Sequence, residues 1–193
     1  MKNRKMITIA LTSLVAIALA GCSSFVGPSA QELLSASAPE GVVYVDVDES
    51  SPSAPDGELT FHGGETVQLS DLTDDRPAVL LFFDTWCTTC IEAQPSLNET
   101  AERYGDAVAF IAVASASDQE DIAAYARDHE LPYAAVLDAD GSLAQSFAVD
   151  EAPFTVLLGQ GNRLVRGWSY YPEDLEDAID DLLVESMPET EGR

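Results

Sequence analysis

AVLLFFDTWCTTC, residues 78–90, carries the strongest structural signal in this chain of 193 residues. Residues 78–83 form a continuous apolar run, which is typical of a strand buried on both faces of a sheet. Residues 88–103 have the composition of a helix. The stretch therefore predicts a buried strand that passes directly into a helix, with Cys87 and Cys90 at the start of that helix.

The flanking sequence continues the alternation of strand and helix. Apolar runs at residues 107–114 and 133–137 predict two more strands, and Asp118 is the expected cap of a helix between them. Because crossovers within one sheet are right-handed, these strands should lie parallel and side by side. Two hairpins are predicted, one from strands at 58–61 and 66–69 and one from strands at 154–158 and 163–168. Residues 70–77 should form a loop, and a last helix should begin at Pro172. The sum is an α/β fold: a central mixed β-sheet with helices on both faces and an N-terminal β-hairpin.

Cys87 and Cys90 lie three positions apart, so their thiols can form a disulfide with little backbone movement. Unpaired N–H groups and the dipole at a helix N-terminus favour an anion, so the Cys87 thiol should have a lowered pKa and be the attacking thiolate. Cys90 lies one turn further in and should resolve a mixed disulfide. Two other interpretations of the pair remain, a purely structural disulfide and half of a zinc site. For zinc, only His62 and His129 could add ligands.

The cysteine pair in this setting resembles the thioredoxin superfamily, and most closely the membrane-tethered, extracytoplasmic TlpA/ResA-like thiol–disulfide oxidoreductases. The similarity covers about residues 57–185 and rests on GETVQLSDL (64–72), RPAVLLFFDTWCTTCIEAQP (76–95) and LPYAAVLDADGSLAQSFAVDEAPFTVLLGQGNRLVRGW (131–168). It implies a thioredoxin-like fold with Pro153 as a cis proline that faces the cysteines. The Ala152 backbone would then offer an edge to an extended substrate, and Trp86 would shield one side of the site. A trans Pro153 in an edge strand and a half-buried packing role for Trp86 are the alternatives.

The chain lacks the acidic residues that members of these families have near the cysteines for proton transfer. Many TlpA/ResA-like proteins have a functional Glu three residues after the second cysteine, where this chain has Ala93. Glu92 cannot take its place, because one position on a helix rotates a side chain by about 100°. Thioredoxins have a buried Asp six residues before the first cysteine, where this chain has Leu81. Asp84 is the nearest upstream acid and is either a loop residue or a proton carrier.

The N-terminus has the pattern of a lipoprotein signal peptide. A basic start precedes the apolar run 6–20, and Leu19-Ala20-Gly21-Cys22 is similar to a bacterial lipobox, in which Cys22 is lipidated. An ordinary secretory signal and a membrane anchor with a chance cysteine are the alternatives. The expected organisation is a signal peptide at 1–21, a lipidated N-terminus and tether at 22–56 with a possible short strand at 41–48, a thioredoxin-like domain at 57–186 and a tail at 187–193.

Acidic residues dominate the charge. The sequence has 34 Asp and Glu against 9 Lys and Arg, a net charge of −25, and removal of residues 1–21 would make it −28. A surface of this sign repels phosphate, which excludes nucleic acid as a partner. A salt-rich habitat, a basic partner or a plain well-solvated surface would each fit this charge.

The resemblance implies an enzyme held in the cell membrane through acylated Cys22 and facing the extracytoplasmic side, which reduces protein disulfides with Cys87 and Cys90. It implies protein thiol clients such as apocytochrome c, a membrane electron donor that re-reduces the pair, and neither a metal nor a cofactor besides the redox-active disulfide. A disulfide-forming oxidant could use the same residues, since only the reduction potential differs. A peroxidase is a further alternative, although that chemistry normally has Thr or Ser at the position of Asp84. A non-enzymatic acidic lipoprotein that binds a partner is the last.

Overall fold

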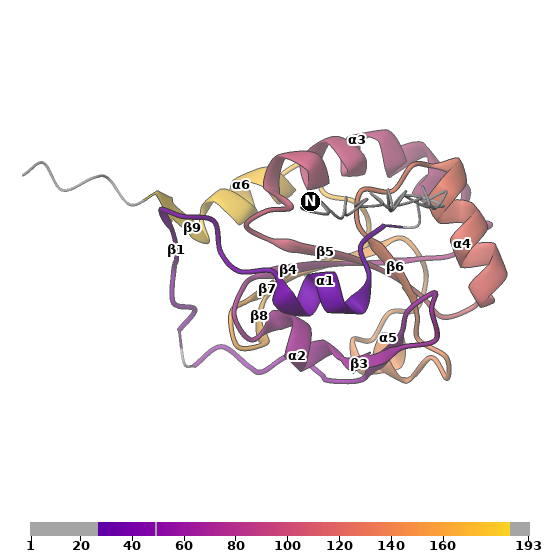
Figure 1. The fold of residues 1–193 in the computed structure, drawn as a ribbon, viewed down its shortest axis with the longest axis horizontal. Coiled ribbons are helices and arrows are strands. Elements are labelled where there is room, and N and C mark those ends of the chain that lie inside the picture. Colours follow the sequence, from indigo (N-terminus) through magenta and orange to yellow (C-terminus); the bar gives the residue numbers. More distant parts are fainter. Residues whose placement is uncertain (1–26, 49, 186–193) are drawn as a thin grey trace, which may run out of the picture.

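The computed structural model describes residues 27–48 and 50–185 (Figure 1). Predictions about residues 1–26 and 186–193, among them lipidation of Cys22 and the C-terminal tail, lie outside this range. The strands are β1 (Val42–Tyr44), β2 (Glu58–Thr60), β3 (Thr66–Gln68), β4 (Ala78–Phe83), β5 (Ala109–Ala114), β6 (Ala134–Leu137), β7 (Phe154–Gly159), β8 (Arg163–Trp168) and β9 (Leu183–Glu185). The helices are α1 (Ala30–Ser35), α2 (Leu69–Thr73), α3 (Thr88–Tyr104), α4 (Gln119–Asp128), α5 (Ser142–Ser146) and α6 (Leu175–Asp180).

A mixed sheet of seven strands forms the centre, in the order β3-β2-β6-β5-β4-β7-β8. β4 and β5 are parallel, as are β5 and β6, whereas β4 and β7 are antiparallel with Phe82 opposite Phe154. All six residues of β4 are buried, as its apolar sequence predicts. β4 therefore ends inside the molecule, and the residues that follow it are held at a fixed place.

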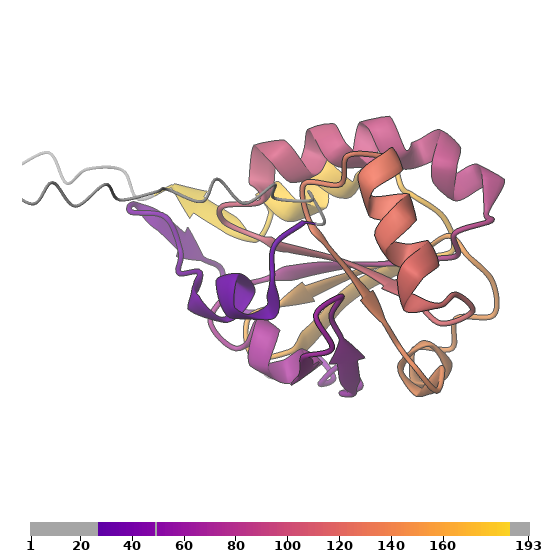
Figure 2. The same ribbon diagram turned by 45° about the vertical axis from the view of Figure 1, so that its right-hand side comes forward.

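Side chains of β4 alternate between two hydrophobic cores, one on each face of the sheet. Val79 and Leu81 pack with residues of α3, α4 and α6, whereas Leu80 and Phe82 pack with residues of α1, α2 and α5. Figure 2 shows these two helical layers with the sheet between them. With the β2–β3 hairpin in place, the predicted mixed sheet with helices on both faces and an N-terminal hairpin is confirmed.

Two short helices differ from the prediction. Residues 70–77 were expected as a loop but include most of α2, where Leu69 and Leu72 are buried three positions apart. The last helix begins at Leu175 rather than at Pro172, and Asp174 flanks it with a non-helical backbone. In both cases burial of leucines against the sheet, which is a tertiary effect, sets the helix boundaries.

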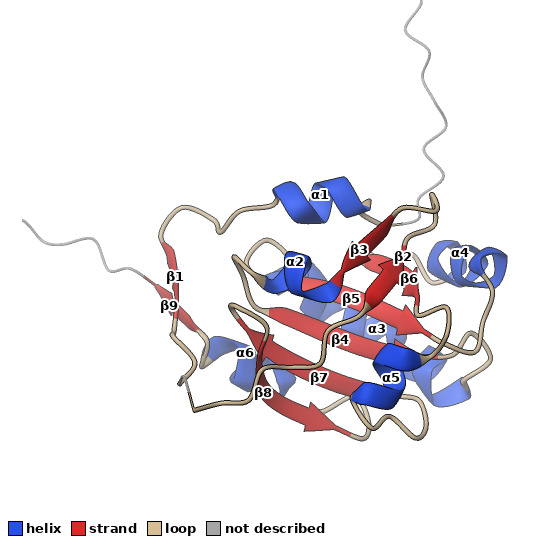
Figure 3. Cartoon of the chain, turned by 90° about the horizontal axis from the view of Figure 1, so that it is seen from below, coloured by secondary structure: helices blue, strands red, loops and turns tan. Residues whose placement is uncertain are grey.

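Residues 27–48 fold against the domain, and this corrects the predicted tether. α1 buries Ala30 and Leu33 in the core. β1 pairs antiparallel with β9 (Figure 3). The hydroxyl of Tyr44 donates to the carbonyl of Ala107 at 2.6 Å. The domain therefore starts well before residue 57, and only part of the strand candidate at 41–48 forms. Across the described ranges, no helix is both long and apolar enough to cross a bilayer.

Candidate active site

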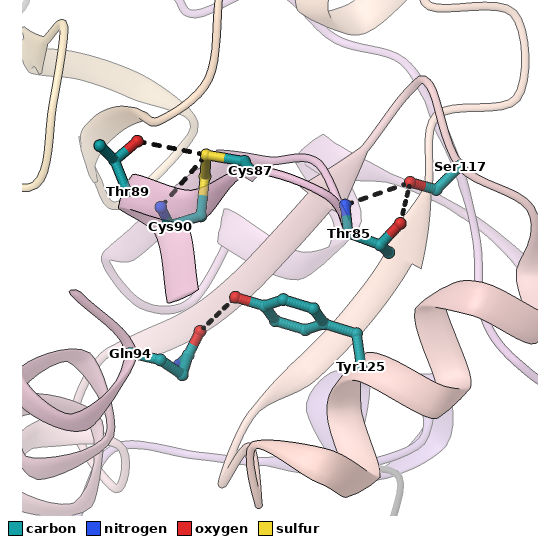
Figure 4. The surroundings of a disulfide bond; sticks show 7 residues. All are labelled: Thr85, Cys87, Thr89, Cys90, Gln94, Ser117 and Tyr125. Carbon is teal, nitrogen blue, oxygen red and sulfur yellow. Dashed lines mark hydrogen bonds between the residues drawn. A yellow bond between two sulfur atoms is a disulfide. The ribbon is translucent and has the colours of Figure 1, made fainter. Parts of the chain in front are cut away.

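Cys87 caps the N-terminus of α3, and its sulfur is bonded to that of Cys90 with an S–S distance of 2.07 Å (Figure 4). The backbone N–H of Cys90 donates to Cys87 Sγ at 3.1 Å, and the Thr89 hydroxyl lies 3.4 Å from the same sulfur. The N–H of Cys87 donates to the carbonyl of Asp84 at 3.0 Å, which holds the turn between β4 and α3. The structure thus contains the predicted buried strand, the turn after it and the helix that begins at the cysteine pair.

The position of Cys87 Sγ favours a thiolate once the disulfide is reduced. A helix N-terminus carries partial positive charge, and a charged sulfur accepts an N–H bond more strongly than a neutral one. The N–H of Cys90 already points at this sulfur. Cys90 is within the first turn, where its sulfur is not at the helix end. The geometry therefore fits Cys87 as the attacking and Cys90 as the resolving thiol.

The disulfide is largely buried. Cys87 retains 6% of its exposure and Cys90 3%, so the first cysteine is the more accessible one by a small margin. Trp86 is 71% exposed, which rules out the half-buried packing role. Ile91, one turn after Cys87, is also exposed. Exposed apolar side chains thus flank Cys87 along the chain.

Pro153 lies at the start of β7, next to the end of β4. The Ala152–Pro153 peptide bond is cis, as the resemblance implies, and the trans alternative is wrong. Pro153 and Cys90 line the same small cavity. Ala152 borders a surface hollow of about 170 Å³ together with Asp84 and Glu151. The structure thus brings Pro153 and the cysteine pair together, with Ala152 at the rim of the hollow.

A buried polar cluster lies behind the disulfide. The side-chain amide of Gln94 in α3 donates to the hydroxyl of Tyr133 and accepts a hydrogen bond from Tyr125 at 3.1 Å (Figure 4). These three side chains, Cys90 and Leu81 all border a cavity of about 20 Å³. Burial raises the pKa of Tyr125 to about 12 and raises that of Tyr133 as well, so both phenols are neutral at physiological pH. Sequence reasoning missed this cluster, although a Gln four positions after Cys90 on the same helix face was a possible signal.

Asp84 directly follows β4 and has a perturbed carboxyl. Burial raises its pKa above the ordinary value, and a hydrogen bond from the backbone of Ala116 acts in the opposite direction. The neighbouring Thr85 hydroxyl pairs with Ser117 at 3.1 Å. Asp84 is therefore a loop residue whose carboxyl accepts a proton more readily than an ordinary aspartate.

Neither Ala93 nor Glu92 supplies the carboxylate that the resemblance implies behind the second cysteine. Ala93 lines the cavity behind the disulfide, and Glu92 is exposed to solvent. Within residues 27–48 and 50–185, no three His, Cys, Asp or Glu side chains are grouped so that they could hold a metal ion.

Residues 51–166, more than half of the chain, match the model of a known protein family. The chain belongs to the AhpC/TSA family. One relative is a thioredoxin-like protein of Haemophilus influenzae, 30% identical over 98 residues, which are 51% of this chain and 58% of that protein. Another is the thiol:disulfide interchange protein DsbE of Escherichia coli, 28% identical over 104 residues, which are 53% of this chain and 54% of that protein. The chain thus spans little more than half the length of these relatives.

Solved structures agree on the fold of this AhpC/TSA family chain. A thiol–disulfide oxidoreductase from Bacteroides fragilis superposes with a TM-score of 0.61 at 21% identity, over 67% of this chain and 98% of that one. Together with the sequence relatives, this confirms the thioredoxin superfamily and the TlpA/ResA-like resemblance. The family match contains Cys87, Cys90 and Pro153, whereas α1, β1, α6 and β9 lie outside it.

Proposed function

We propose that this chain is a lipid-anchored thiol–disulfide oxidoreductase that reduces protein disulfides on the extracytoplasmic side of the cell membrane. One observation carries the proposal: Cys87 Sγ lies at the N-terminus of α3, accepts the N–H of Cys90 and is bonded to the sulfur of that residue. The relative DsbE is a thiol:disulfide interchange protein, which supports the same class of chemistry.

The reaction begins with the reduced pair. The Cys87 thiolate attacks one sulfur of a client disulfide; the client S–S bond breaks, a mixed disulfide forms, and the other client sulfur leaves as a thiolate that takes up a proton. Cys90 then loses its proton and attacks Cys87 Sγ, which releases the second client sulfur as a thiol. The client gains two electrons and two protons, and Cys87 and Cys90 end as a disulfide.

A donor of electrons must reduce this disulfide again, and for an anchored protein we propose a membrane electron donor. Clients are proteins with a disulfide near their surface, and apocytochrome c is the expected example. The opposite direction, disulfide formation, would use the same atoms. Reductants of this superfamily have potentials of about −270 mV and strong oxidants of about −120 mV, so the reduction potential of the pair separates the two directions.

Anchoring is proposed through Cys22, because a basic start, an apolar run and Leu19-Ala20-Gly21 precede it. Two or three acyl chains give stable attachment, since each buried CH2 contributes about 0.8 kcal/mol.

The decisive experiment traps the client. In Cys90→Ser the resolving sulfur is gone, so the mixed disulfide at Cys87 should persist and be identified by mass spectrometry after non-reducing electrophoresis. Cys87→Ser is the matched control and should trap nothing. A Cys90→Ser protein that yields no adduct from either oxidised or reduced cells would contradict exchange chemistry, and an unchanged cellular function of Cys87→Ser would favour the non-enzymatic binding protein.

A further inference from the structure

The N-terminal segment is fixed to the domain from its first described residue. The backbone of Gly27 has φ +73°, and a Cβ there would lie 2.1 Å from the carbonyl oxygen of Tyr133, so only glycine allows this close approach. α1 follows at once and is closed at its start by a capping box of Ser29 and Glu32. Leu33 of α1 is buried among residues of the second core. This segment is therefore part of the folded unit and not a free linker.

Three contacts of this segment with the domain lie at one end of the central sheet. Gly27 contacts Tyr133, the residue before β6. The carbonyl of Leu33 accepts a hydrogen bond from buried Arg76, two residues before β4, and Tyr44 bonds the carbonyl of Ala107, two residues before β5. β4, β5 and β6 are parallel, so these contacts lie at their common N-terminal end.

The disulfide lies at the other end. Cys87 follows the C-terminal end of β4, a strand of six residues. At about 3.3 Å per residue, this strand separates the two ends of the sheet by about 20 Å. The N-terminal segment and the redox pair are thus on opposite ends of the molecule.

Little chain remains between the proposed lipid and this fixed segment. Cys22 and Gly27 are five positions apart, and a fully extended chain of that length reaches at most about 18 Å. The segment also exposes apolar side chains: Leu34 is 44%, Val43 52% and Val45 40% exposed. The segment itself contains Glu32 and Glu40 and no Lys or Arg, and the whole chain has a net charge of −25, so a bilayer of zwitterionic lipids suits this surface better than an anionic one.

We infer that the face formed by residues 27–45 is the membrane-facing side of the domain, and that the Cys87–Cys90 pair is presented on the opposite side, toward the aqueous phase. The inference rests on the proposed lipidation of Cys22. In this orientation, a client or a membrane electron donor must extend well beyond the bilayer surface to reach the disulfide.

Tryptophan quenching tests this orientation in the full lipidated chain. The protein is bound to phosphatidylcholine vesicles with or without a lipid that carries a nitroxide on its headgroup. Leu34→Trp places an indole on the proposed membrane face, and Val43→Trp repeats the test should the first variant fold poorly. Wild-type emission comes from exposed Trp86 on the far side and from buried Trp168. The indole added at position 34 or 43 should lose emission in nitroxide vesicles, whereas wild-type emission should not change.

Two controls separate orientation from anchoring. Flotation with the vesicles reports attachment, which Cys22→Ala should abolish. A flexible Gly/Ser insertion between Val26 and Gly27 lengthens the connection and should restore the emission of Leu34→Trp. If wild type floats but its own emission is quenched as strongly as that of Leu34→Trp, or neither added indole is quenched, the orientation is overturned. If wild type does not float, the anchoring itself fails, while the trapping result with Cys90→Ser stays valid.

Discussion

Asp84 is the carboxylate that follows β4 directly, and the two positions where the resemblance implies acidic residues are occupied here by Leu81 and Ala93. The cavity behind Cys90 is bordered by the neutral groups of Gln94 and tyrosines, which can hydrogen bond but do not ionise at physiological pH. Charge near the redox pair is thus set mainly by the end of α3 and by Asp84.

The raised pKa of Asp84 has a consequence for stability. Burial raises the pKa above its ordinary value of 3.8, so the folded protein binds this proton more tightly than the unfolded chain. The free energy of unfolding therefore receives its largest contribution from Asp84 at low pH, and this contribution declines as the pH rises through the folded-state pKa. Asp84→Asn removes this decline. We expect the variant to have a higher melting temperature than wild type at about pH 7, and a difference that shrinks toward about pH 4.

Thermal melts across this pH range measure the effect. Glu92→Gln, which removes an exposed carboxylate from α3, controls for the loss of one negative charge. Equal stability of Asp84→Asn and wild type at every pH would show that the carboxyl is fully solvated in the folded state.

Individual site residues could be placed from the sequence where a local sequence pattern marks them. Cys87, Cys90 and Asp118 stand at helix starts, and Pro153 lies in a recognisable motif, so all four could be placed without a structure. Gln94, Tyr125 and Tyr133 could not, because they come from α3, α4 and the start of β6 and meet only after the sheet has formed.

Among the elements, α1 has one large buried side chain beside the small Ala30. Leu33 is 8% exposed, whereas its neighbour Leu34 is 44% exposed and contributes little to packing. Removal of a buried leucine side chain costs about 2–5 kcal/mol, and α1 lies at the edge of the core, so the lower end of this range applies.

We therefore expect Leu33→Ala to loosen residues 27–48 by about 2 kcal/mol, which corresponds to roughly thirty-fold faster amide hydrogen exchange there. Leu34→Ala on the same helix is the matched control and should leave exchange unchanged. Unaltered exchange in Leu33→Ala would mean that β1 and Tyr44 hold the segment without help from α1.

The elements that the sequence predicts are those with a long, clear pattern. β4, α3 and α4 have such patterns, and their predicted bounds agree with the structure within about two residues. α1 and α2 have only two buried apolar side chains each, too few to show a period. β9 has no pattern of its own; it forms because β1, from the other end of the chain, lies beside it.

For the whole molecule, the main electrostatic feature is the excess of acidic over basic residues. The chain has 34 acidic residues. Among the residues that the structure describes, the side-chain ion pairs are Arg103 with Glu176 and Arg166 with Asp174, both substantially exposed. Exposed pairs contribute little, about 0–1 kcal/mol each. Added salt therefore screens mainly the repulsion between carboxylates, because there are few attractive ion pairs for it to weaken.

An increase in NaCl from about 0.05 M to about 0.5 M should raise the melting temperature, because the screening length falls well below about 10 Å. The measurement is a melt series at about pH 7, with a parallel series near pH 4, where protonated carboxyls repel less and the gain should be smaller. A melting temperature that falls with salt at neutral pH would show that attractive pairs outweigh the repulsion.

The pairing of β1 with β9 matters for anyone who shortens this protein. The family match starts at residue 51, a natural place to cut for expression. Such a cut deletes β1, and the backbone groups of β9 that face it would be left without partners. A bare strand edge readily recruits a second molecule, so shortened versions should aggregate even with their redox chemistry intact.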